Sequence, residues 1–149
     1  MEKTNNNIPT AEELAICIKE SAISVNSTYE QSPVVLMVDD AVIGTLGNFS
    51  ASIGKAKSKK TFNVSAIAAS ALVNGTVLHY RASFPKSKQQ ILYIDTEQGQ
   101  NHCQNVLKRI QLLADLPDDK DVDNLTMLTL RKYSPEMRLA IVEPAIDTI

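Results

Sequence analysis

The segment from Gly54 to Thr61, which reads GKAKSKKT, constrains the fold of this chain more than any other part of the sequence. It follows an apolar stretch, Phe49–Ile53, that predicts a short strand. It precedes Thr61–Asn74, an alanine-rich and largely apolar stretch that predicts a helix packed onto a sheet. A glycine-bearing loop between a strand and such a helix is typical of α/β proteins that hold phosphate at the helix N-terminus.

Strands and helices continue to alternate after this helix. The predicted elements are a strand at Ile91–Ile94, a helix at Asn101–Ala114, a strand at Leu125–Leu130 and a helix that opens at Ser134-Pro135-Glu136. The first of these strands is apolar without alternation, as in a parallel sheet covered on both faces. The order predicts a mainly parallel sheet with helices on its faces. Gly75 is expected to stop the first helix, and Pro144 to end or kink the last one near Val142.

The N-terminal part of the chain predicts a separate arrangement. Residues 1–33 are expected to form a polar leader, a short helix and a linker, and residues 34–149 a partial nucleotide-binding domain. Thr10 and Glu13 have the spacing of a capping box at the start of the short helix. Val34–Val38 and Val42–Leu46, separated by Asp39-Asp40, predict a hairpin.

Composition excludes several classes of protein. A length of 149 residues with 44% apolar content suits one globular domain, and a net charge of −2 argues against a wholesale nucleic-acid or membrane surface. No apolar run approaches the roughly 18 residues that a membrane span needs, and the first residues lack a signal-peptide core. Cys17 and Cys103 have no CxxC spacing, so we expect neither a zinc site nor a disulfide framework, and a cytoplasmic location.

The spacing of Gly54, Lys60 and Thr61 fits the P-loop pattern GxxxxGK[ST]. In such a loop the lysine reaches the β- and γ-phosphates of ATP and the hydroxyl binds Mg²⁺. Lys59 departs from the pattern, which has glycine there; if that position needs a positive φ, lysine strains the loop by about 1 kcal/mol. The alternative is a solvated basic turn. The residues predicted to bind ATP are Gly54, Lys55, Ala56, Lys57, Ser58, Lys59, Lys60, Thr61 and Phe62.

A second candidate group ends the next strand, in the segment ILYIDTEQ. Asp95 could bind Mg²⁺ through water, and Glu97 could orient the water that attacks the γ-phosphate. The alternative is that Asp95 or Thr96 caps the following helix. Arg131 and Lys132 follow the third strand and are expected at the same edge of the sheet, as phosphate or DNA contacts or as solvated charges.

Three segments together, TLGNFSASIGKAKSKKTF, ILYIDTEQ and LTLRKYSPEMR, resemble RecA-superfamily ATPases of the RepA-like replicative helicase type. More closely, they resemble AAA-family ATPases carried on bacterial mobilisable elements. The resemblance implies a RecA-like fold, ATP and Mg²⁺, a hexamer-like homo-oligomer and a link to DNA replication or mobilisation. Under it, Glu97 and Lys60 match the catalytic residues, and Asp95 is not the Walker B aspartate.

The family's Walker B strand is expected after the helix that opens near Ser134, and the sequence ends before such a strand. We therefore expect an N-terminal fragment that binds nucleotide weakly and turns over little by itself. Two alternatives stay open. One is a small P-loop phosphotransferase with Asp95 on Mg²⁺ and Arg81 or Arg131 on the acceptor. The other is a non-catalytic module whose lysine loop binds nucleic acid.

Overall fold

The computed structural model describes residues 9–55 and 59–148, and the chain divides into two compact units, Met1–Gln31 and Ser32–Ile149. In the first unit, helix α1 (Ala11–Ser21) begins with the predicted capping box. The Thr10 hydroxyl accepts a hydrogen bond from the Glu13 amide at 3.2 Å, and the Glu13 carboxylate accepts one from the Thr10 amide at 2.7 Å. None of the helix residues is buried, so α1 is held by local interactions.

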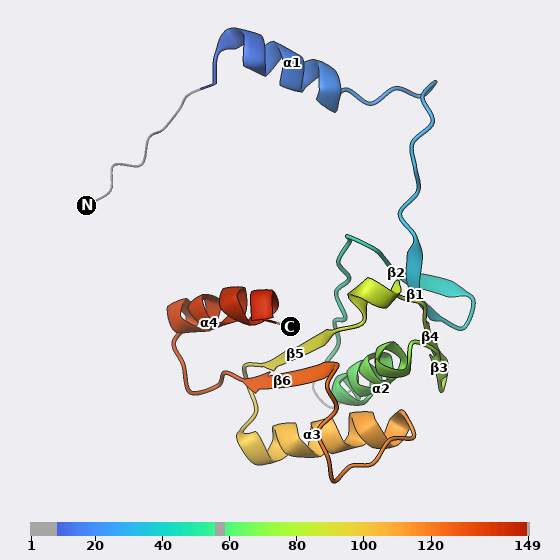
Figure 1. Ribbon diagram of the computed structural model, residues 1–149, viewed down its shortest axis with the longest axis vertical. Coiled ribbons are helices and arrows are strands. Elements are labelled where there is room, and N and C mark those ends of the chain that lie inside the picture. The colour runs from blue at the N-terminus through green and yellow to red at the C-terminus, as the bar shows by residue number, and fades with distance from the viewer. Residues whose placement is uncertain (1–8, 56–58, 149) are drawn as a thin grey trace. The chain divides into compact units, whose positions relative to one another are not determined.

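The second unit contains the remaining helices and strands (Figure 1). They are β1 (Val34–Val38), β2 (Ala41–Thr45), α2 (Lys60–Val73), β3 (Thr76–Val77), β4 (Tyr80–Ala82), the 3₁₀ helix η1 (Lys86–Lys88), β5 (Ile91–Asp95), α3 (Gln100–Leu113), β6 (Leu125–Thr129) and α4 (Pro135–Thr148).

Four of the strands form an antiparallel sheet in the order β2-β1-β4-β3. The β1–β2 hairpin is the predicted one. Its turn residue Asp39 has a positive φ of 48°, and its amide donates to the carbonyl of His79, in the turn between β3 and β4, at 2.8 Å. The His79 Nδ1 also lies 2.9 Å from the Asp39 carboxylate, so the two hairpin turns are joined by both backbone and side chain.

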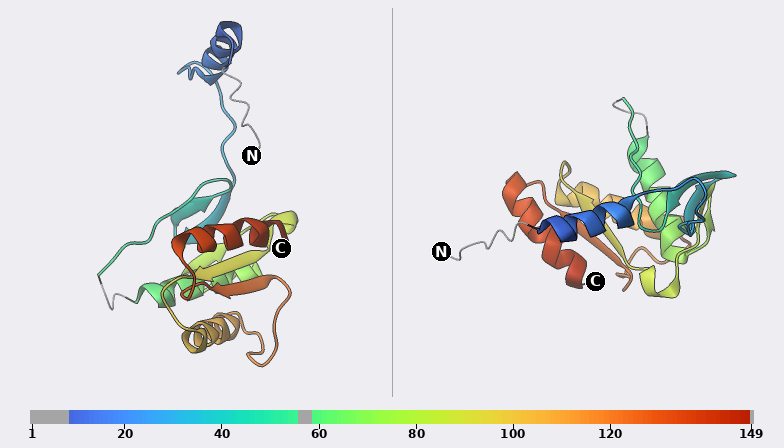
Figure 2. Two further views of the ribbon diagram at one scale, coloured as in Figure 1. Left: turned by 90° about the vertical axis from the view of Figure 1, so that its left-hand side faces the viewer. Right: turned by 90° about the horizontal axis from the view of Figure 1, so that it is seen from above.

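The other two strands, β5 and β6, form a parallel pair in register from Ile91 opposite Leu125 to Asp95 opposite Thr129. Helices α3 and α4 lie on opposite sides of this pair (Figure 2). The core lies on the α3 side, where α2 packs against α3. The buried residues of α2 are mostly small: Ser65, Ala66, Ala68, Ala69 and Ser70, with Leu72, and Ala68, Ala69 and Leu72 belong to the core cluster shared with α3. Small side chains let the two helices approach closely around Ile110, which is fully buried.

The predicted fold class, a mostly parallel RecA-like sheet, is wrong. The structure is mixed α/β, with an antiparallel four-stranded sheet and a separate parallel pair. Phe49–Ile53, expected to be the strand before the loop, has no strand conformation, and Phe49 and Ile53 are 95% and 93% exposed. An apolar, β-branched composition favours a strand only where a partner edge is present, and among the described residues this segment pairs with none.

Two helix ends also differ from expectation. Asn74, not Gly75, takes the left-handed conformation that ends α2, with φ 48°. Its side chain explains the choice, because Asn74 accepts from the Phe84 amide at 2.6 Å and donates to the Phe84 carbonyl at 3.0 Å. Helix α4 continues through Pro144, and none of its residues is buried. No helix in residues 9–55 and 59–148 has both the length and the hydropathy required to cross a bilayer.

Candidate functional site

The N-terminus of α2 is an uncapped helix end with two lysines. Lys59 precedes the helix with a left-handed backbone, φ 59° and ψ 21°, and offers no side-chain cap. Its carbonyl accepts from the amides of Phe62 at 3.0 Å and Asn63 at 3.1 Å. The first turn contains no acidic residue. The leading amides of a helix have no intrahelical partner and carry a partial positive charge, so this end favours an anion.

Lys60 folds back over the segment that precedes the helix. Its ammonium donates to the carbonyl of Gly54 and lies 3.4 Å from that of Lys55. Three of the predicted nucleotide-binding residues are thereby brought together. The predicted residues Ala56, Lys57 and Ser58 lie outside the described part of the chain.

Thr61 and Phe62 occupy the first turn of α2. The Thr61 carbonyl accepts from the Ser65 hydroxyl at 2.8 Å, an ordinary helical back-bond. Phe62 is exposed, and its ring is therefore accessible beside the lysines. Both positions agree with a helix start at the end of the loop, as the spacing of the motif requires.

Asp95 closes a tight turn at the end of β5. Its Oδ1 accepts from the amides of Glu97 at 2.9 Å and Gln98 at 2.7 Å. Helix α3 begins after Gly99, so neither Asp95 nor Thr96 caps it, and that alternative is wrong. The Thr129 hydroxyl donates to the Gln98 carbonyl at 2.9 Å and ties the turn to the end of β6. Glu97 itself is exposed.

Tyr93, two residues before Asp95, is a neighbour that the sequence did not single out. Partial burial raises the pKa of its hydroxyl, and the Asp95 charge adds to this, while Arg109 opposes it. Tyr93 packs against the core, so its side chain lies on the α3 side of the strands. The carboxylate of Asp95 therefore stands at the border between the core and the exposed turn.

The structure does not join the two predicted groups directly. Within the described residues, no hydrogen bond or ion pair links Asp95 or Glu97 to the lysines at the start of α2. Helix α2 contacts β5, so the two groups belong to adjacent elements. No cluster of three or more His, Cys, Asp or Glu ligands occurs in residues 9–55 and 59–148.

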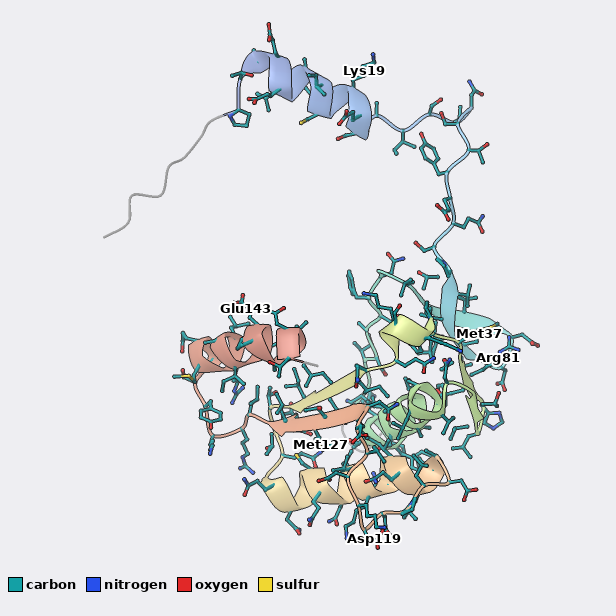
Figure 3. The ribbon with its side chains drawn as sticks, in the orientation of Figure 1. Lys19, Met37, Arg81, Asp119, Met127 and Glu143 are labelled. Carbon is teal, nitrogen blue, oxygen red and sulfur yellow. The ribbon has the colours of Figure 1, made fainter. Side chains whose placement is uncertain are left out.

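The two arginines assigned to a phosphoryl acceptor lie apart from each other. Arg81 is on β4, where its Nη2 contacts the Met37 sulfur on β1 at 2.9 Å (Figure 3). Arg131 follows β6 and lines a cleft of about 800 Å³ together with Lys132. The same cleft includes Gly99 and Tyr133, which were not predicted as site residues, because the two come together only through the pairing of β5 with β6.

The sequence matches no known protein-family model, and no curated protein or solved structure is significantly similar to the chain.

Proposed function

We propose that this chain binds ATP with Mg²⁺ through the Gly54–Thr61 loop, as part of a cytoplasmic ATPase linked to DNA replication or mobilisation. The observation that carries the proposal is the position of the Lys60 ammonium. It is held against the carbonyls of Gly54 and Lys55, beside a helix end with no cap of its own. An ammonium held by two neutral carbonyls can exchange them for phosphate oxygens, which are stronger acceptors.

The amides at the start of α2 that precede Phe62 add to this attraction, since the first amides of a helix point toward its N-terminal end and have no acceptor within the helix. The contrast with α1 is informative. There Glu13 and Thr10 already satisfy the helix end, whereas at α2 the Lys59 side chain provides no cap and the first turn has no acidic residue. The start of α2 thus has the electrostatic character of an anion site, and the neighbouring lysines reinforce it.

The remaining residues take roles in hydrolysis. The Thr61 hydroxyl, and Asp95 through water, are the groups proposed to hold Mg²⁺, which would offset the charge on the phosphates. Glu97 is exposed at the end of the Asp95 turn and is proposed to orient the attacking water. Asp95 uses Oδ1 to hold that turn, so it also positions Glu97.

Calorimetric titration with a slowly hydrolysed ATP analogue and Mg²⁺ tests the binding. We expect Lys60→Ala to weaken binding by about tenfold to a hundredfold, because a charge-assisted hydrogen bond contributes about 1.5–3 kcal/mol. Lys108→Ala is the matched control, since Lys108 is an exposed lysine on α3. Equal affinities for the wild type and Lys60→Ala, or an equal loss in Lys108→Ala, would contradict the proposal.

Glu97→Gln separates hydrolysis from binding. We expect this variant to keep its affinity for the analogue and to lose the slow phosphate release that we expect of the wild-type chain. The assay is also run on a longer version of the protein, with and without single-stranded DNA, which should stimulate phosphate release there. A Glu97→Gln variant with wild-type turnover would remove Glu97 from the mechanism without affecting the binding site.

A further inference from the structure

The cleft at the end of β6 is a candidate for a further binding site because of its size and the charge of its lining residues. It has a volume of about 800 Å³, within the range of small-ligand sites. Arg131 and Lys132 line it, and none of its lining residues is acidic. Part of its wall is apolar, formed by Met127, Leu128 and Ile141.

The turn that presents these cations is fixed by a third cation. Arg138, on α4, donates from Nε to the carbonyls of Leu130 at 3.1 Å and Tyr133 at 2.9 Å. Its Nη2 donates to the carbonyl of Arg131 at 3.2 Å. Because one guanidinium satisfies three carbonyls of the same turn, the backbone of residues 130–133 is held in place. Arg131 and Lys132 therefore belong to a turn whose backbone is fixed by hydrogen bonds.

Within the described residues, neither Arg131 nor Lys132 forms an ion pair with a carboxylate within 4 Å. The one ion pair found within 4 Å in residues 9–55 and 59–148 joins His79 to Asp39, and both residues are distant in sequence from this turn. Glu136 is the nearest acidic residue in sequence. Hydrogen bonds to its own backbone amide and to Ser134 lower its pKa.

An aromatic ring lies directly beside the cations. The Lys132 ammonium is 4.9 Å from the centre of the Tyr133 ring, a cation–π distance. The cleft thus combines two cations, a flat ring and an apolar wall. Phosphate-binding cations next to a ring on which a base can stack are the elements that recognise nucleotides in single strands.

We propose that this cleft is a second anion site, which binds a nucleotide unit, either free or within a single strand. The phosphate contacts Arg131 and Lys132, and the base lies against Tyr133 and the apolar wall. An acidic peptide would use the cations but would gain nothing from the ring. The site is separate from the Gly54–Thr61 loop and does not require that loop to bind ATP.

Fluorescence anisotropy with a labelled twelve-nucleotide oligo(dT), and competition by free dTMP, test the proposal. We expect Arg131→Ala/Lys132→Ala to weaken oligonucleotide binding by at least tenfold. The slope of log K against log salt should become shallower by about 1.4, since each single-strand phosphate contact contributes about 0.7. Tyr133→Leu should weaken binding by about tenfold through lost stacking, with an unchanged salt slope.

Lys86→Ala/Lys88→Ala, on η1 and outside the cleft, is the matched control and should bind as the wild type does. Lys60→Ala should also retain oligonucleotide binding, which distinguishes this site from the ATP site. Competition by dTMP at similar concentrations to oligo(dT) would assign the site to free nucleotides, and much weaker competition would assign it to strands. No binding by the wild type, an equal loss in the η1 control, or an acidic peptide that competes as well as oligo(dT) would overturn the proposal.

Discussion

Lys59 stands where the P-loop pattern has glycine, and its backbone is left-handed with φ 59°. A residue with a Cβ pays for this conformation, whereas glycine does not. We expect Lys59→Gly to raise the free energy of unfolding by about 1 kcal/mol, measured by urea denaturation. The same variant should retain ATP-analogue binding, because Lys60 is unchanged.

Lys59→Ala provides the control, since it removes the same side chain but keeps the Cβ. It should show no comparable gain in stability. A gain of equal size in Lys59→Ala would attribute the effect to charge repulsion among the lysines, and the backbone explanation would then fail.

At the scale of single elements, α1 depends on its cap. It has eleven residues and buries none of them, and isolated helices shorter than about 12–15 residues are marginal in water. We expect Thr10→Ala to destabilise α1 by about 1 kcal/mol, visible as a loss of helical NMR shifts over Ala11–Ser21. The thermal midpoint of the second unit should not change. A shifted midpoint would show that α1 contributes to the stability of that unit.

Elements with strong local signals were predictable from sequence. The capping box of α1, the β1–β2 hairpin and the apolar run of β5 each encode their structure within a few residues, and each formed where expected. The strands β3 and β4 have only two and three residues, which is too short for a periodic pattern to mark them. Phe49–Ile53 has the composition of a strand but no partner strand among the described residues. Strand pairing depends on residues far apart in the sequence, and the predicted sheet topology is wrong for that reason.

The candidate site also has features that follow from local sequence and features that do not. The position of Lys60 at the first residue of α2 follows from motif spacing, which is local. The contact of its ammonium with the Gly54 carbonyl, the use of Asp95 Oδ1 to hold its own turn, and the cleft beside Tyr133 depend on how loops close in three dimensions. No pattern of residue types in the sequence specifies them.

At the scale of the whole molecule, the second unit depends on the contact between α2 and α3. Ile110 on α3 is fully buried in this core, while Leu112 on the same helix is 62% exposed. We expect Ile110→Ala to lower the free energy of unfolding by about 2–5 kcal/mol. Leu112→Ala should change it by about 0.5 kcal/mol or less. Urea unfolding of both variants is the measurement, and similar losses would mean that the α2–α3 contact is not the core.

The hydrogen bonds at the end of α2 also bear on the chemical durability of the protein. Asn74-Gly75 is the dipeptide most prone to deamidation, a reaction in which the glycine nitrogen attacks the asparagine side-chain carbonyl. Here the Gly75 amide donates to the Ser70 carbonyl at 3.0 Å, and both polar atoms of the Asn74 side chain are bonded to Phe84. The reacting groups are held apart from the cyclic imide geometry. Deamidation of Asn74 is therefore expected only in molecules in which these hydrogen bonds at the end of α2 have broken.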